Sequence, residues 1–116
     1  MDLRPRRIGD VIVLGPAGRV DHLNADDFRE AVEPHLAQCE AGGASLLFDL
    51  SGLEYISSSG LRVLMIAAKL SKPRGGRIAV AAPRPVVAEV LEISRFNLVF
   101  PVHASVADAV QSLASE

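Results

Sequence analysis

The stretch SLLFDLSGLEYISSSGL, residues 45–61, contains the transition that decides the fold class. Its first part, residues 45–50, is a nearly continuous apolar run, which is typical of a strand buried on both faces of a sheet. Its end begins an amphipathic helix that we expect over residues 58–70. The apolar face of that helix is formed by residues at helical spacing, namely Leu61, Leu64, Met65 and Ala68.

Shorter β-rich runs lie on both sides of this stretch. Bounded by Gly and Pro breaks, they predict further strands at residues 11–14, 17–20, 78–81 and 98–100. An edge strand is also expected around residues 3–8. Pro5 weakens that expectation, because proline has no N–H to donate to a neighbouring strand.

The first helix is predicted to begin at Asn24, a favourable N-cap residue, with Asp27 placed to complete an approximate capping box. Gly42-Gly43 is expected to end it. Pro34 lies inside the pattern and should kink the helix, because it cannot donate to the carbonyl of the preceding turn. The apolar stripe of this helix is predicted to be Phe28, Val32, Leu36 and Cys39.

Two further helices follow in the second half of the chain. Pro85 suits the first turn of one of them, because its missing N–H is not needed there. Ser105 is expected to start the other, with Asp108 completing a second capping pattern. Their buried residues are predicted to be Val87, Val90 and Leu91 in the first, and Val106, Ala109, Val110 and Leu113 in the second.

The alternation of strands and helices predicts the fold class. Such an order implies right-handed crossovers and an α/β fold around a largely parallel sheet. The opening strands should add antiparallel pairing at one side, so we expect a mixed sheet of four to five strands with about four helices. At 116 residues, the chain is predicted to form a single domain over residues 1–116.

Composition excludes several classes of protein. The formal net charge is −2, which argues against direct nucleic-acid binding. The only cysteine, Cys39, excludes an intramolecular disulfide and fits a reducing compartment. It should be buried as a small apolar residue. The chain shows neither a secretory signal nor an apolar run of the roughly 20 residues that would span a bilayer. We therefore expect a cytoplasmic protein without membrane insertion.

Catalytic and metal-binding patterns are missing from the sequence. It contains no dinucleotide or phosphate-loop glycine motif, no HExxH and no GxSxG. His22, His35 and His103 do not show the spacing of metal ligands. Asp49 and Glu54 form a conceivable acid/base pair but lack a further catalytic group. The prediction is a protein that is not an enzyme and has no metal and no cofactor.

The run Ser57-Ser58-Ser59-Gly60 at the expected start of the second helix stands out instead. A serine there accepts a hydrogen bond from an unpaired backbone N–H, and one serine is enough for that capping. An exposed hydroxyl at a helix N-terminus also suits a phosphate, because the free N–H groups and the helix dipole stabilise negative charge. Gly60 removes side-chain bulk, which should leave the helix start approachable by another protein. Capping and phosphorylation both remain open on the residues alone.

The motifs around this run resemble the STAS-domain anti-sigma factor antagonists. In that family a buried strand ending in Asp-Leu-Ser, here residues 49–51, leads to a hydrophobic-Asp-Ser-Ser-Gly-Leu motif, here residues 56–61. Gly18-Arg19-Val20-Asp21, followed by Asn24 at a helix start, is similar to another family pattern. The resemblance covers approximately Asp10 to Leu113 and implies a STAS fold.

The resemblance also implies a function. Family members are phosphorylated by a partner that is both a serine kinase of the GHKL ATPase type and an anti-sigma factor. A PP2C-like phosphatase restores the unmodified form, which binds the kinase and releases its target. The matching phospho-acceptor is Ser58. The partner-binding residues implied here are Asp21, Asn24, Ser57, Ser58, Ser59, Gly60, Leu61 and Arg62.

Two residues depart from the family pattern. Ser57 occupies the usual acidic position, which makes it a rival phospho-acceptor, and Arg62 replaces a residue that is often small. Arg62 lies four residues after Ser58, on the same helical face. An alternative reading is a STAS regulatory subunit that binds the ATPase of an ABC (lipid) transporter without phosphorylation. The intact Ser58-Ser59-Gly60 favours the switch protein.

Overall fold

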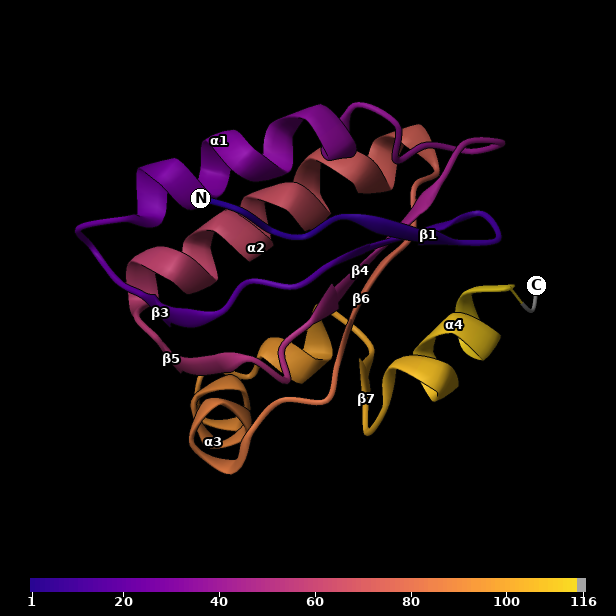
Figure 1. The fold of residues 1–116 in the computed structure, drawn as a ribbon. Helices are drawn as coiled ribbons and strands as arrows, with labels where there is room; N and C mark the ends of the chain where they lie inside the picture. Colours follow the sequence, from indigo (N-terminus) through magenta and orange to yellow (C-terminus); the bar gives the residue numbers. More distant parts are fainter. Residues whose placement is uncertain (115–116) are drawn as a thin grey trace.

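The computed structural model describes residues 1–114, in which short strands alternate with helices (Figure 1). The strands are β1 (Arg6–Ile8), β2 (Val11–Leu14), β3 (Gly18–Val20), β4 (Ser45–Asp49), β5 (Leu53–Ile56), β6 (Ile78–Ala81) and β7 (Val102–His103). The α-helices are α1 (Ala25–Leu36), α2 (Ser58–Ser71), α3 (Pro85–Ile93) and α4 (Val106–Ala114). Two short 3₁₀ helices are η1 (Lys72–Arg74) and η2 (Phe96–Leu98).

A five-stranded sheet in the order β1-β2-β4-β6-β7 forms the centre of the molecule. β1 pairs antiparallel with β2, and the other neighbours pair in parallel. This arrangement confirms the predicted α/β fold with a mixed, mostly parallel sheet and four helices. The antiparallel strand lies at the edge, as expected from the opening of the chain, and it begins directly after Pro5.

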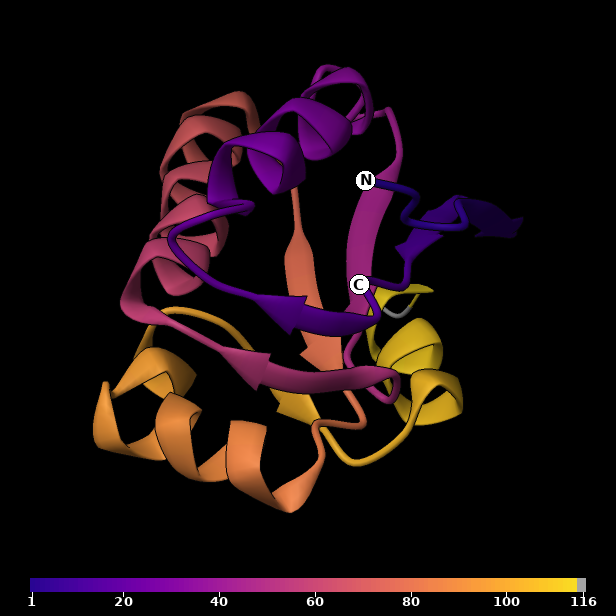
Figure 2. The same ribbon diagram turned by 60° about the vertical axis from the view of Figure 1, so that its left-hand side comes forward.

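Helices cover both faces of this sheet. Figure 2 shows α1 and α2 along one side of the sheet and α4 on the other. Side chains alternate between the faces along each strand. The larger core, under α1 and α2, receives Ile12, Leu14, Leu46, Phe48 and Val80 from the strands. The smaller core, under α4, joins Val11, Val13, Leu47, Ala79 and Ala81 to Ala109 and Leu113.

β3 and β5 form a second, two-stranded parallel sheet. β3 confirms the predicted extended piece at residues 17–20, but it does not join the main sheet. β5 is a strand that the sequence pattern does not predict, between the buried strand β4 and the serine run. Leu53 and Ile56 are buried, and α3 packs against β5. This pairing brings the end of β3 beside the start of α2.

The first helix is shorter than predicted. It contains Pro34 but ends at Leu36, and the prediction that it continues to the glycine pair is wrong. After it, Gln38 N–H donates to His35 C=O and Cys39 N–H donates to Leu36 C=O, so i to i−3 bonds replace the helical ones. Cys39 therefore lies in the following turn, where it is fully buried as expected.

The strand predicted at residues 98–100 is also wrong. Residues 96–98 form η2, in which Leu98 is 77% exposed, and the strand comes later, at β7. The rings of Phe96 and Phe100 stack at 4.7 Å, so the segment turns to bury both. An extended strand would place residues 98 and 100 on one face, which does not fit one exposed and one buried side chain.

The later helix starts agree with the sequence. Pro85 is the first residue of α3. Ser105 Oγ accepts a hydrogen bond of 3.0 Å from Asp108 N–H at the start of α4. Within residues 1–114, no helix is long and apolar enough to cross a membrane.

Candidate functional site

The start of α2 is held by Ser57, which is the N-cap residue of the helix. Ser57 has extended backbone angles, and its Oγ accepts a hydrogen bond of 3.3 Å from Gly60 N–H. Its carbonyl accepts from Leu61 N–H at 2.9 Å. Its own N–H donates to Val20 C=O at 2.9 Å, which joins the helix start to the end of β3. Capping is therefore assigned to the first serine of the run.

Ser58 is the first helical residue, and it is exposed. Its hydroxyl makes no hydrogen bond within residues 1–114, and neither its N–H nor that of Ser59 has an acceptor there. The first N–H groups of a helix have no partner inside it and point toward its N-terminus. An unengaged hydroxyl thus lies beside two unengaged donors and the positive end of the helix dipole.

Gly60 is buried beneath the helix start. A Cβ at this position would lie 2.7 Å from Val20 Cγ1 and 2.7 Å from Ile56 Cγ1. The absence of a side chain therefore allows α2 to pack closely on the ends of β3 and β5. The expectation that Gly60 leaves the surface open to a partner is wrong, because the space beside it is filled by the protein itself.

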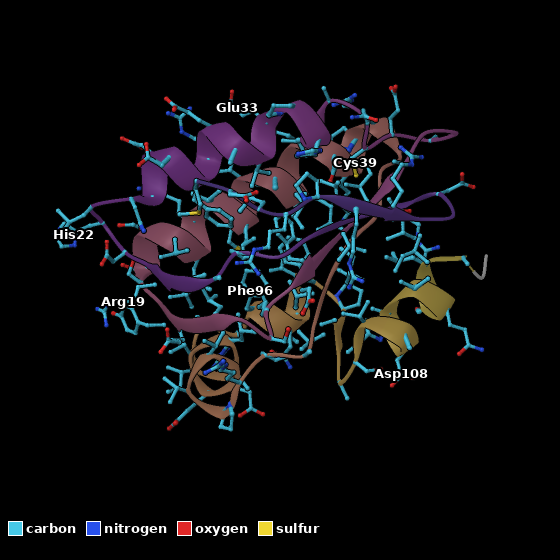
Figure 3. All side chains as sticks on the ribbon, in the orientation of Figure 1. Arg19, His22, Glu33, Cys39, Phe96 and Asp108 are labelled. Carbon is cyan, nitrogen blue, oxygen red and sulfur yellow. The ribbon has the colours of Figure 1, made fainter. Side chains whose placement is uncertain are left out.

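Two further candidates, Asp21 and Asn24, belong to the loop between β3 and α1, in which Figure 3 labels His22. This loop begins next to the start of α2, because Val20 C=O at the end of β3 accepts from Ser57 N–H. Asn24 precedes α1, but its side chain does not cap the helix, so the predicted capping box with Asp27 is wrong. Instead, Asn24 Oδ1 accepts from Asp21 N–H and Asn24 Nδ2 donates to Arg19 C=O, both at 2.8 Å. Asp21 Oδ1 accepts from Leu23 N–H at 2.9 Å. The Asn24 side-chain amide thus makes its hydrogen bonds within the β3–α1 loop and not to the N-terminus of α1.

Arg62 and Ser58 line the same open groove, of about 500 Å³, between α2 and residues 94–96. Leu61, which is buried, contributes to its lining. Arg62 and Lys69 form no ion pair with any residue from 1 to 114. No acidic residue lines the groove, so it carries positive charge in a protein of net charge −2.

Sequence reasoning did not identify the far part of this groove. Its remaining lining residues are Ser59, Met65, Ile66, Lys69, Ser94 and Phe96. The sequence does contain a pattern that indicates the part of the groove on α2. Its residues recur at spacings of four, three and four and share one helical face, namely Ser58, Arg62, Met65 and Lys69. The contribution from residues 94–96 had no such pattern.

The other candidate groups have structural roles. Asp49 Oδ1 accepts from Ser51 N–H at 3.0 Å, and its Oδ2 lies 3.8 Å from the Arg6 guanidinium. Glu54 is exposed, and no hydrogen bond or ion pair joins it to Asp49 within residues 1–114. Among residues 1–114, no three His, Cys, Asp or Glu side chains are placed to hold a metal ion.

Comparison with known proteins agrees with this geometry. A family model described as the STAS domain matches residues 2–109. BtrV of Bordetella bronchiseptica, whose name assigns it to the anti-sigma factor antagonists, is 37% identical over 103 residues, which cover 88% of this chain and 85% of BtrV.

Solved structures share the fold. One, from Thermotoga maritima and named for the same class, has a TM-score of 0.84 at 23% identity and covers 95% of this chain and 92% of its own. Another, the Bacillus cell fate determinant SpoIIAA in its phosphorylated form, has a TM-score of 0.69 at 17% identity, with coverages of 95% and 97%. The architecture is therefore that of an α/β protein with the STAS fold. The chain belongs to the STAS family, with the anti-sigma factor antagonists, which are not enzymes.

Proposed function

We propose that this protein is a cytoplasmic anti-sigma factor antagonist of a partner-switching system, with its switch at Ser58. The unmodified form binds a serine kinase of the GHKL ATPase type that is also the anti-sigma factor, and this binding releases the kinase's target. Phosphorylation of Ser58 blocks the binding, and a PP2C-like phosphatase reverses it. The names of the relatives and the phosphorylated SpoIIAA structure support this proposal.

The observation that carries the proposal is that two adjacent serines differ in the hydrogen bonding of their hydroxyl groups. Ser57 Oγ is engaged in the cap with Gly60 N–H, whereas the Ser58 hydroxyl is exposed and unengaged within residues 1–114. A kinase can therefore modify Ser58 without breaking the hydrogen bond that begins α2. The Ser57 hydroxyl is less accessible, because it is half-buried and its oxygen already accepts from Gly60 N–H, and this favours Ser58 over its rival.

The surface offered to the partner combines the α2 start with the neighbouring loop. Ser58 and Arg62 are its exposed members on α2, and Asp21 and Asn24 belong to the loop that begins where β3 meets Ser57. Gly60 and Leu61 are buried, so we assign them to shaping this surface. Ser57 and Ser59, which are half-buried, complete it.

The switch follows from electrostatics at such a surface. A phosphate adds a charge of about −1.5 to −2 at pH 7 where the partner meets a neutral hydroxyl. The complex is weakened because the phosphate loses its hydration in the interface and is repelled by acidic groups of the partner. A penalty of about 4 kcal/mol corresponds to a loss of affinity of about a thousandfold.

The decisive experiment incubates the purified protein with a GHKL-type kinase and Mg-ATP and locates added phosphate by mass spectrometry. Phosphate on Ser58, its loss in Ser58→Ala, and its retention in Ser59→Ala support the proposal. Phosphate on Ser57 alone would move the switch by one residue. A protein that binds its partner but is never phosphorylated fits the alternative, a regulatory subunit bound to the ATPase of an ABC (lipid) transporter.

A further inference from the structure

Arg62 is a cation that α2 leaves without a partner. The helix contains no Asp or Glu, and its only charged residues are Arg62 and Lys69. The Arg62 side chain forms neither an ion pair nor a hydrogen bond with any residue in the described part of the chain. It lies in the N-terminal half of the helix, where the dipole does not favour positive charge. Within residues 1–114 of the unmodified protein, no side chain therefore pairs with this charge.

The helical neighbours of Arg62 restrict what could compensate it. Side chains three and four residues apart on a helix are adjacent, with about 5–6 Å between their Cβ atoms. For Arg62 these neighbours are Ser58, Ser59, Met65 and Ile66, all of which are uncharged. Two of them are hydroxyls. The only anion that α2 itself can place next to Arg62 is thus a phosphate on one of those two serines.

We propose that Arg62 is the internal counter-ion of a phosphate on Ser58. The inference rests on the proposed function, because it concerns the phosphorylated form of the protein. Ser58 and Arg62 line the same groove, and both are exposed. The guanidinium reaches the phosphate from the second turn of α2, and the unengaged N–H groups of Ser58 and Ser59 lie at its other side. Charge-assisted bonds of this kind are among the strongest in proteins.

The position of Arg62 also distinguishes among the three serines. Ser57 lies five residues before it, on a different side of the helix at 3.6 residues per turn, and its hydroxyl is engaged in the cap. Ser59 is adjacent to Arg62 but half-buried. Arg62 therefore stabilises a phosphate on Ser58 and not one on Ser57. The helix N-terminus alone would favour a phosphate on any of the serines, whereas Arg62 favours a phosphate on Ser58.

A consequence is a more acidic phosphate. A positive charge next to a phosphate favours its doubly ionised form. The second proton of phosphoserine is normally lost near pH 6. Arg62 should shift that loss to lower pH, so that a larger fraction of the modified protein carries the dianion near neutral pH.

The test places phosphoserine at position 58 by genetic encoding, so that no kinase is needed, and follows its ³¹P NMR shift between pH 4 and pH 8. In Arg62→Gln, the midpoint should rise by about 0.5 pH unit, as for a surface ion pair. The matched control is Lys69→Gln. It removes the same charge from the same helix about 16 Å from Ser58, beyond the screening length of about 8 Å, and should leave the midpoint unchanged. Arg62→Lys should retain most of the effect.

A second arm encodes phosphoserine at position 57, where Arg62→Gln should not move the midpoint. Equal midpoints for Arg62→Gln and the wild type at position 58, or equal effects of Arg62→Gln and Lys69→Gln, would overturn the inference. Circular dichroism checks that each variant is folded. Because the phosphate is encoded, a failure of this test leaves the kinase experiment intact, and a failure of the kinase experiment leaves this test readable.

Discussion

Gly60 allows the start of α2 to pack closely on the two-stranded sheet. A Cβ would lie 2.7 Å from Val20 Cγ1 and Ile56 Cγ1, and both neighbours are β-branched residues with restricted rotamers. Gly60→Ala should destabilise the protein by about 1–2 kcal/mol, because overpacking outweighs the better helix propensity of alanine. Urea denaturation measures this change.

Gly15→Ala is the control for that substitution, because the nearest atoms to its added Cβ lie at 3.9 Å. The two variants should differ clearly in their free energy of unfolding. If Gly60→Ala were as stable as Gly15→Ala, the helix start would not be packed as described.

The serines of the run should separate into a structural residue and a switch residue. Ser57→Ala removes the Oγ that accepts from Gly60 N–H, and should cost about 1 kcal/mol in the free energy of unfolding. Ser58→Ala removes a hydroxyl that has no partner in residues 1–114, so its effect should stay within about 0.5 kcal/mol. Thermal denaturation of the two variants compares them. Equal losses would contradict the assignment of the cap.

Cys39 provides a prediction about pH. Burial raises the pKa of its thiol above the usual 9.0, and this effect outweighs the smaller opposing effects of neighbouring backbone groups. The Sγ donates a hydrogen bond of 3.5 Å to Arg77 C=O. Because the folded pKa is raised, the stabilisation is complete below the unfolded pKa and is lost as pH rises through the folded pKa. Between pH 8 and pH 10, the wild type should therefore lose more stability than Cys39→Ala. Parallel urea midpoints of the two proteins over this range would contradict the burial effect.

At the scale of elements, the strongly periodic segments were predictable from the sequence. Each of these segments buries the residues that its hydrophobic pattern predicts. This holds for the apolar run of β4 and for the apolar faces of α2 and α4, so sequence pattern and tertiary packing agree. The site was found in the same way, since three serines before an apolar helical pattern indicate a helix start. Local signals were sufficient wherever one hydrophobic pattern continues through the whole segment.

Features that depend on particular contacts were not predictable. β5 is only four residues long and becomes a strand through its pairing with β3, far earlier in the chain. Leu98, Val99 and Phe100 are β-prone in composition, yet the stacking of Phe100 on Phe96 turns the chain there. The amide of Asn24 is drawn into the β3–α1 loop rather than onto the helix. Only β5 depends on a distant partner. The other two outcomes depend on contacts within five residues, the Phe96–Phe100 ring stack and the Asn24 hydrogen bonds, which hydrophobic periodicity does not describe.

α4 is the element that covers the second face of the sheet, and its contribution should be measurable. Leu113, 7% exposed, packs with residues of β2, β4 and β6. Leu113→Ala should therefore cost about 2–3 kcal/mol through lost burial and a residual cavity. Leu70→Ala, at a residue that is 54% exposed on α2, is the matched control and should change stability by less than about 0.5 kcal/mol. Chemical denaturation compares the two, and similar costs would contradict the role of α4 as a cover.

At the scale of the whole molecule, the switch needs no change of fold. The hydroxyl of Ser58 is exposed, its neighbour Ser57 holds the helix, and Gly60 holds the helix against β3 and β5. Charge can thus be added to the surface while the core remains as it is. The regulation that we propose is therefore local and electrostatic, with Arg62 as the residue that tunes it.

The central claim is that a phosphate on Ser58 prevents partner binding. The most direct measurement is calorimetric titration of a GHKL-type kinase that binds this protein with two preparations, unmodified and carrying encoded phosphoserine at position 58. The phosphorylated preparation should bind about a thousandfold more weakly, with both preparations equally folded. Equal dissociation constants for the two preparations would contradict it.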